Sequence, residues 1–310
     1  MKSFILKTIL FILIPTTILA FSLFFIPNTK IPDNSLYANI DKQERIKTLK
    51  GKRIILVGGS NLAFGVISPL IEKELGIPVV NMGLHAGLGI NYILSEVEDY
   101  IHKEDIVIVS PEYHHFTSRS MYNGEDVLVA LAFDVNRECM KHIKTSQWIS
   151  LLPQIFLYSS KKLINLSNNP VDSFEQLFNR GSFNMYGDEV AHYGLPSAIS
   201  SGHKETLKKE ISYRSIKRLK TFQTHTKSKG ATLIITACPY PEKQYSKDSA
   251  IINSVSCELE KAGLHLSIKP QECLLPDSMM FNSYFHPTKE GAEIRTRQLI
   301  HIIKENVDQN

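Results

Sequence analysis

A serine and a histidine near opposite ends of the chain are the residues whose types and surroundings could do chemistry. Ser60 follows the run Arg53–Gly59 (RIILVGG), and its hydroxyl could attack an acyl carbon as a nucleophile. His286 stands in the segment Tyr284–Thr288 (YFHPT), and an imidazole is the usual general base for a serine. The alternatives are a phosphate-cradling or plain strand-to-helix turn at Ser60, and a polar surface histidine at position 286.

The residues before Ser60 predict a buried strand that ends in a tight turn. Ile54–Val57 is an unbroken apolar run with two isoleucines and a valine, which is typical of a parallel strand covered on both faces. The following Gly58 and Gly59 favour a turn that leaves Ser60 at the carboxyl end of the strand. Ligands of open α/β sheets bind at that edge, so the position suits a reactive side chain.

Strands and helices are expected to alternate through the rest of the domain. Such alternation at short spacing predicts a parallel sheet with right-handed crossovers, and thus an α/β fold. A strand is expected to begin at Pro78 and to break into a glycine-rich loop before Gly89, and further strands are expected at Ile106–Ser110, Ala231–Ala237 and Leu264–Ile268. The helices are expected at about 68–75 with a cap at Gly76, and at about 90–102, 204–228, 250–261 and 292–305.

The region from about 114 to 204 loses this rhythm and is expected to be an insertion in a domain that runs from 51 to 310. It is rich in Asn, Ser, Tyr and Phe and contains the single Trp148 and the segment Phe183–Asp188, followed by His192. Such an insertion could lie over the carboxyl edge of the sheet and supply specificity, or it could be a packing subdomain.

The first residues of the chain predict a membrane anchor, assigned to residues 1–27. Thr8–Ile26 is an almost unbroken apolar run with Lys2 and Lys7 on its amino side, which places the amino terminus in the cytoplasm and the domain outside it. A cleaved secretory peptide is the alternative, but no A-x-A-like site follows Phe25. Residues 28–50 are polar and are expected to be a linker.

Charge and cysteine content exclude several functional classes. The net charge of the 310 residues is +4, and the basic residues gather between about 204 and 229, where they suit the solvated face of a helix. No nucleic-acid motif accompanies them. The four cysteines show no C-x-x-C spacing, so neither a zinc nor a redox site is expected, and Cys238 is expected to be a buried thiol.

Three segments together resemble the SGNH (GDSL-like) hydrolase superfamily, and most closely its membrane-anchored bacterial envelope branch. They are Gly58–Asn61 (GGSN), Asn81–Gly87 (NMGLHAG) and Tyr284–Thr288 (YFHPT). The resemblance covers about residues 52–113 and 231–303. It implies a flavodoxin-like three-layer sandwich with Ser60 as nucleophile and His286 as base. It also implies that the backbone N–H of Gly83 helps to hold the oxyanion. Asn61 and Glu112 are further candidate oxyanion or binding residues.

The chain departs from the superfamily's pattern in two places. The third block of the superfamily usually offers an asparagine to the oxyanion, whereas strand three here runs into Ser110–His115 (SPEYHH). The acid expected a few residues before the histidine is replaced by Asn282 or Ser283, and Asp277 and Glu112 are the alternative partners. An amide can orient an imidazole, but it cannot stabilise the imidazolium by charge.

These observations predict a serine-dependent acyl esterase or O-acyltransferase that acts on cell-envelope glycan through a Ser-His dyad or triad. The expected partners are an acylated glycan or small acyl ester, a membrane acyltransferase and the lipid bilayer, with no nucleic acid, metal or cofactor. The expected location is the bacterial inner membrane, with a single-pass anchor and an extracytoplasmic domain. The alternative is a non-catalytic envelope assembly or binding protein that keeps the fold.

Overall fold

A five-stranded parallel sheet forms the centre of the molecule. The computed structural model describes residues 1–26, 34–165, 178–199 and 206–308. The strands lie in the order β2-β1-β3-β4-β6, and every neighbouring pair is parallel. The predicted α/β class and parallel sheet are therefore confirmed. The strands are β1 (Ile54–Gly58), β2 (Val79–Asn81), β3 (Ile106–Ser110), β4 (Thr232–Thr236) and β6 (Leu266–Ile268).

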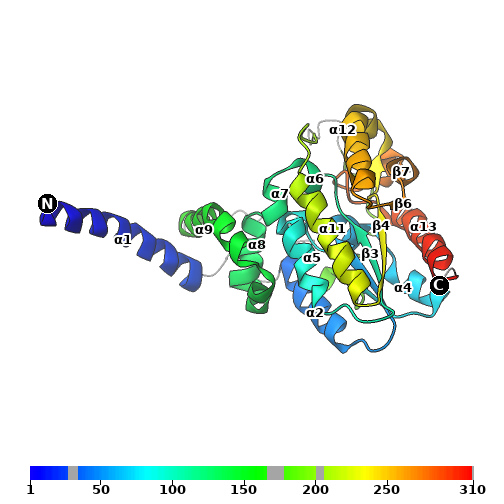
Figure 1. Cartoon of the computed structure of the whole chain (residues 1–310), viewed down its shortest axis with the longest axis horizontal. Helices are drawn as coiled ribbons and strands as arrows, with labels where there is room; N and C mark the ends of the chain where they lie inside the picture. Colours follow the sequence, from blue (N-terminus) through cyan, green and yellow to red (C-terminus); the bar gives the residue numbers. More distant parts are fainter. Residues whose placement is uncertain (27–33, 166–177, 200–205, 309–310) are drawn as a thin grey trace.

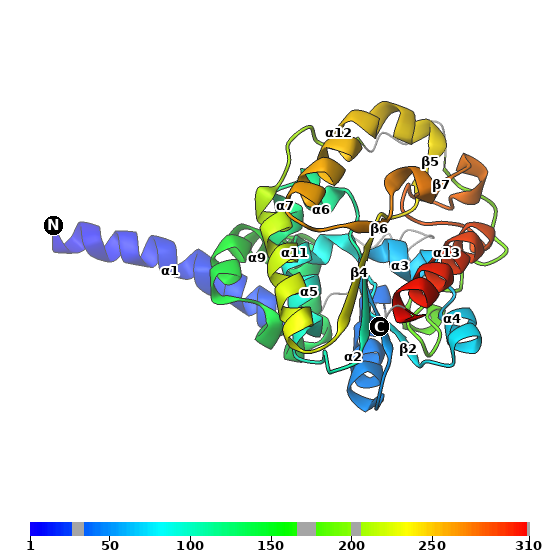
Figure 2. The same cartoon turned by 45° about the vertical axis from the view of Figure 1, so that its right-hand side comes forward.

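Helices cover both faces of this sheet and make a three-layer arrangement. Because successive strand residues point to opposite faces, β1 contributes Ile55 and Val57 to one hydrophobic cluster and Ile54 and Leu56 to another. Figure 2 shows β4 between α5 and α11 on one side and α3, α4 and α13 on the other. The covering helices are α2 (Ala38–Thr48), α3 (Ser60–Gly65), α4 (Ser68–Leu75), α5 (Ile90–Glu98), α11 (Tyr213–Ser228), α12 (Glu242–Lys261) and α13 (Lys289–Asp308).

A second small sheet and several short helices complete the fold. β5 and β7 form a separate parallel pair. Their bounds are β5 (Tyr240–Pro241) and β7 (Leu274–Leu275). The single-turn helices are η1 (Ser35–Tyr37), η2 (Ala86–Leu88), η3 (Leu131–Val135), η4 (Arg137–His142), η5 (Arg180–Ser182), η6 (Pro270–Cys273) and η7 (Asp277–Met279).

Most predicted elements are present, with shifted ends. The strand at 106–110 and the helix at 68–75 match their predicted bounds, and Gly76 caps that helix in the left-handed conformation at φ 66°. The helix expected at about 90–102 already ends at Glu98, and the one expected from about 204 begins at Tyr213. The helix expected from about Ala250 begins earlier, at Glu242.

The prediction of a linker over residues 28–50 is wrong for residues 34–48. This part of the chain forms η1 and α2, and α2 packs beside β2 with Ile46 1% exposed. The buried side of α2 also carries polar residues, Asn39, Lys42 and Gln43, so no apolar periodicity marks it in the sequence. Residues 28–33 of the expected linker lie outside the described part.

The described parts of the expected insertion do two different things. Its first part folds into helices that stack beside α5 and α1. Its second part, 178–199, runs along α3, where the Glu189 N–H donates to the Ala63 carbonyl over 2.8 Å. The first part of the insertion therefore packs against other helices, and the second part approaches the carboxyl edge of the sheet. The helices are α6 (His114–Thr117), α7 (Ser120–Asn123), α8 (Asp126–Ala130) and α9 (Thr145–Asn165).

The amino-terminal apolar run forms a long helix that projects from the domain. This helix, α1 (Lys2–Phe25), is long and apolar enough to cross a membrane, and 11% of its apolar window is buried by the protein. Figure 1 shows it extending away from the body, with only its carboxyl end beside α9. The expected apolar helix is therefore present, and its length and composition fit either a single-pass anchor or a signal sequence.

Candidate active site

Ser60 lies where the strand order of the sheet reverses. β1 is flanked by β2 on one side and β3 on the other, and the chain runs from β1 to one neighbour and then back across to the other. A crevice opens outside the carboxyl ends of two such strands, which is where ligands bind in open α/β sheets. Ser60 is the first residue of α3, directly after the β1 turn, and its side chain is half-buried.

His286 is held by a closed loop between η7 and α13. The Phe281 N–H donates to the His286 carbonyl over 2.6 Å, and Met280 pairs with Pro287 in an isolated antiparallel bridge. The Thr288 N–H donates to the Met279 carbonyl over 2.8 Å. Because both ends of the loop are tied together, the imidazole has a defined direction toward the sheet edge.

Ser60, His286 and Asn282 form one hydrogen-bonded chain. The Nε2 atom of His286 lies 2.8 Å from Ser60 Oγ, and its Nδ1 atom lies 2.7 Å from Asn282 Oδ1. If Nδ1 carries the proton, it donates to the amide oxygen, and Nε2 is left to accept the serine proton. This is the arrangement of nucleophile, base and orienting group that serine hydrolases use.

Packing around His286 also limits its movement. Phe64 stacks on the imidazole, with ring centroids 4.0 Å apart and an interplanar angle of 6°. Phe64 also contacts His192, 4.9 Å away between ring centroids. His192 Nε2 lies 3.1 Å from the Pro287 carbonyl, and its Nδ1 pairs with the Glu189 carboxylate. Both His192 and Glu189 are fully buried, so they support the loop from behind rather than face the crevice.

The Glu112 carboxylate occupies the other side of Ser60. Its Oε1 atom lies 3.2 Å from Ser60 Oγ and accepts the Asn61 backbone N–H over 3.0 Å. Register explains the placement, because the last residues of the two strands, Gly58 and Ser110, pair with each other, and Ser60 and Glu112 each follow two residues later. A Cβ on Gly59 would come within 2.5 Å of Glu112 Oε1, so glycine is required at position 59 for this approach.

A buried histidine fixes the backbone that carries Glu112. His115 Nδ1 accepts the Glu112 backbone N–H over 3.1 Å, so its Nε2, 3.1 Å from the Ala86 carbonyl, carries the proton and donates. Burial lowers the pKa of His115 from 6.5 to about 4. The ring is therefore neutral near pH 7, and it joins the loop after β3 to the glycine-rich loop after β2.

The remaining predicted binding residues are close to Ser60 but engaged in the protein. The Gly83 N–H donates to Asn81 Oδ1 over 3.0 Å, and a Cβ there would lie 2.8 Å from the Gly59 carbonyl. The side chain of Asn61 is 1% exposed and donates to the Ser110 carbonyl over 3.1 Å. Gly83 thus supports the serine turn by close packing, and Asn61 faces the crevice through its backbone rather than its amide.

The alternative partners for the histidine lie elsewhere. Asp277 pairs with Lys243, with 3.4 Å between Oδ2 and Nζ. The Ser283 hydroxyl accepts the Phe285 N–H over 3.3 Å. Asn282 is therefore the alternative that the structure brings to His286 Nδ1. All four cysteines are free thiols; Cys238 is buried as expected, and Cys257 is the exposed one.

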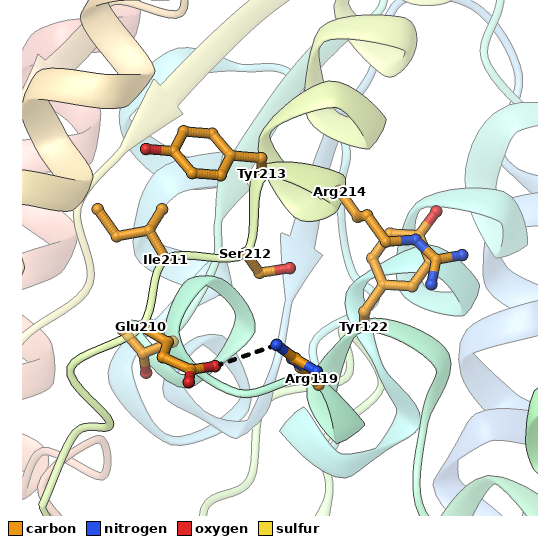
Figure 3. A pocket seen from close by; sticks show the side chains of 8 residues that line it. Arg119, Tyr122, Glu210, Ile211, Ser212, Tyr213 and Arg214 are labelled. Carbon is orange, nitrogen blue, oxygen red and sulfur yellow. Dashed lines mark ion pairs between the residues drawn. The ribbon is translucent and has the colours of Figure 1, made fainter.

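A pocket in the described part of the chain lies away from these residues. It has a volume of about 390 Å³ and lies between α6, α7 and the start of α11. Figure 3 shows that Arg119 and Glu210 form an ion pair at its mouth, and both side chains are solvent-exposed. Its lining residues are Thr117, Arg119, Tyr122, Glu210, Ile211, Ser212, Tyr213 and Arg214.

No protein-family model matches the chain, and no curated protein matches it.

The sequence pointed to Ser60, His286, Asn282 and Glu112 but not to Glu189 or Phe64. Phe64 contacts His286 from a distant part of the chain, and Glu189 acts on the histidine loop only through His192, which contacts Pro287. The only local sequence signal for this pair is the spacing, since Glu189 precedes His192 by three residues in a region without periodicity.

Proposed function

We propose that this chain is a serine-dependent acyl esterase or O-acyltransferase of the SGNH (GDSL-like) type, anchored in the bacterial inner membrane, that acts on acylated glycan of the cell envelope. The observation that carries the proposal is the hydrogen-bonded chain from Ser60 through His286 to Asn282. The strand order β2-β1-β3-β4-β6 supports it, since this is the order of flavodoxin-like sandwiches.

In this reaction His286 takes the proton from Ser60 as Oγ attacks the ester carbonyl carbon. The tetrahedral intermediate then collapses, the C–O bond to the alcohol breaks, and His286 returns its proton to that alcohol. Water or a glycan hydroxyl next attacks the acyl-serine, with His286 again as base. The products are the free acid or a new ester, and Ser60 regains its proton.

The oxyanion must form beside Glu112. The N–H of Asn61, the residue after the nucleophile, is a backbone donor beside Ser60, and Glu112 Oε1 accepts its hydrogen bond. An ionised carboxylate at this place would repel the oxyanion, whereas a protonated or displaced one would not. Turnover therefore requires Glu112 to be neutral or to turn away when substrate binds.

The position of Glu112 also favours a second candidate, a non-catalytic envelope assembly or binding protein. The carboxylate accepts a hydrogen bond from a group that an esterase would present to substrate. A protein that binds glycan without turnover would keep the fold and the crevice but would not label at Ser60.

The test is labelling and turnover in the full chain. Purified protein is treated with a serine-directed fluorophosphonate and, separately, with a simple acetyl ester, in parallel with Ser60→Ala, His286→Ala, the double variant and the control Ser254→Ala. Ser254 is exposed on α12, so its substitution should leave activity unchanged. Each catalytic single variant should lose on the order of a thousandfold or more in kcat, and the double variant should be scarcely worse.

The outcomes separate the two candidates. Additive losses would mean that Ser60 and His286 do not act as one unit. A wild-type protein that neither labels at Ser60 nor turns over any acyl ester would support the non-catalytic candidate.

A further inference from the structure

Helix α9 exposes an apolar face where a soluble protein would present polar residues. Its core side is well covered, with Gln147, Leu151, Tyr158 and Lys162 buried. The opposite side carries large apolar side chains that are exposed. These are Ile149 at 69%, Leu152 at 60%, Phe156 at 61%, Leu157 at 45% and Ile164 at 63%. We call these five residues the α9 apolar face.

No charge interrupts this face over most of the helix. The segment from Thr145 to Ser160 contains no Asp, Glu, Lys or Arg. Lys161, at the edge of the face, is paired with Asp126 over 2.6 Å. Outside α1 and α9, the exposed large hydrophobic residues in the described part of the chain occur singly, as Met185, Leu195, Tyr213 and Ile294. A cluster of this kind marks an interaction surface rather than the ordinary scatter of apolar residues.

The same helix is attached to the end of α1. Ser22 Oγ donates to the Ser159 carbonyl over 2.8 Å, and Lys162 Nζ donates to the Leu23 carbonyl over 3.1 Å. Lys162 is only 4% exposed and also pairs with Asp134, 2.8 Å away. Figure 1 shows α9 beside the carboxyl end of α1 and away from the amino end. The last turn of α1 therefore fixes where α9 lies along the axis of that helix.

The position of this contact coincides with one membrane boundary if α1 spans the bilayer. At a rise of about 1.5 Å per residue, the stretch from Lys7 to Phe25 extends about 28 Å, close to the thickness of the hydrocarbon core. With Lys7 at one boundary, Ser22 and Leu23 lie near the other. α9 then lies at the interface, where amphipathic helices place their apolar side against lipid.

We propose that the α9 apolar face lies in the interfacial layer of the bilayer that α1 spans, as a second attachment of the domain to lipid. The occupant is lipid rather than another protein because helix α9 is attached to the end of α1, whose own apolar side chains are exposed around the helix and need the same environment. The proposal rests on α1 being a retained anchor, and it does not depend on acyl chemistry at Ser60.

The test places a fluorophore at single cysteines in the full chain, reconstituted in vesicles of phosphatidylethanolamine and phosphatidylglycerol. Cys257→Ser removes the exposed thiol, and the other three cysteines are buried. An environment-sensitive label is attached at Phe156→Cys on α9, at Phe11→Cys on α1 and at Ser254→Cys on α12. All three positions are exposed, so the substitutions should not disturb the fold, and Ile149→Cys provides a second position on α9.

The expected result is blue-shifted emission at positions 156 and 149 relative to 254. Lipids with a shallow nitroxide should quench these two labels, and lipids with a deep nitroxide should quench the label at position 11. Labels at 156 and 149 that behave like the label at 254 would overturn the proposal. So would a blue shift without quenching by lipid, which would indicate a protein cover such as a second copy. An unquenched label at position 11 would overturn it as well, because α1 would then not be inserted.

Discussion

The side chain that accepts the Nδ1–H of His286 is the amide of Asn282, where serine hydrolases use a carboxylate. Asn282→Asp presents an oxygen to the same atom, now 2.7 Å from Asn282 Oδ1, and adds a charge that favours the imidazolium of the transition state. We expect kcat/KM on an acetyl ester to be retained or raised. Asn282→Leu removes the acceptor and should lower it on the order of ten- to ten-thousandfold.

Asp277→Asn is the control for this prediction, since Asp277 pairs with Lys243 instead of the histidine. If both Asn282 variants behave like wild type, His286 needs no orienting side chain, and the triad geometry does not describe the working enzyme.

Glu112 carries the second prediction at this scale. Glu112→Gln keeps the shape of the side chain, removes the charge beside Ser60 Oγ and still offers an amide oxygen to the Asn61 N–H, where Oε1 now accepts over 3.0 Å. Since the negative charge that would repel an oxyanion at this place is then absent, we expect kcat to rise about ten- to a hundredfold. The matched control is Glu290→Gln, an exposed carboxylate at the start of α13. A large loss in Glu112→Gln alone would show that the carboxylate itself takes part in the reaction.

The site was partly predictable because its main residues follow strong local signals. Ser60 follows an apolar run and two glycines, and His286 precedes a proline and a helix. The support behind the histidine was not predictable, because His192, which pairs with Glu189, meets Phe64 and Pro287 only through tertiary packing. Nor could the sequence reveal that Glu112 Oε1 would take the Asn61 N–H, since this depends on the register of β1 and β3.

At the scale of elements, strands were predicted better than helices. The strands are short β-branched runs between turn residues, a pattern that identifies them without any knowledge of their neighbours. The helix ends depend on tertiary contacts, and α2 was missed because its buried side is polar. Asn39 and Gln43 donate to Glu96 over 2.6 and 2.8 Å, so hydrogen bonds replace the apolar stripe that marks most helices.

Burial of Lys42 in α2 is expected to make the free energy of unfolding depend on pH. Its Nζ donates to the Asn81 carbonyl over 2.8 Å and to the Gly187 carbonyl, which joins α2 to β2 and to the segment after η5. Burial lowers the pKa of Lys42 from 10.5 to about 7. Between about pH 7 and the unfolded pKa of 10.5, Lys42 is protonated in the unfolded chain but not in the folded chain. The free energy of unfolding therefore increases with pH over this range.

We therefore expect the free energy of unfolding to rise with pH in wild type relative to Lys42→Met, by up to about 1.4 kcal/mol per pH unit. The measurement is urea unfolding in detergent micelles at several values between about pH 7 and 9. Lys47→Met, on the exposed side of the same helix, is the control and should run parallel to wild type. Parallel curves for Lys42→Met as well would mean that Lys42 keeps its proton in the fold.

At the scale of the whole molecule, the attachment of α1 to α9 bears on whether the amino-terminal helix is kept. Removal of α1 would eliminate the hydrogen bond from buried Lys162 to the Leu23 carbonyl and would expose the side of α9 around Ser159 to solvent. A folded domain that uses these contacts is expected to retain the helix. Retention would also explain why an apolar helix that could span a membrane ends in specific hydrogen bonds to the domain.

The prediction from this argument concerns both topology and processing. Because Lys2 and Lys7 precede the apolar run, a reporter fused after Asn310 should be active only if it works outside the cytoplasm. The mature protein should stay in the membrane pellet after an alkaline wash, and its intact mass should include residues 2–25. A reporter that works only in the cytoplasm would contradict the orientation. A mature chain that begins near Pro27 and washes off the membrane would instead identify α1 as a cleaved signal, and the contacts of Ser22 and Leu23 would then exist only in the precursor.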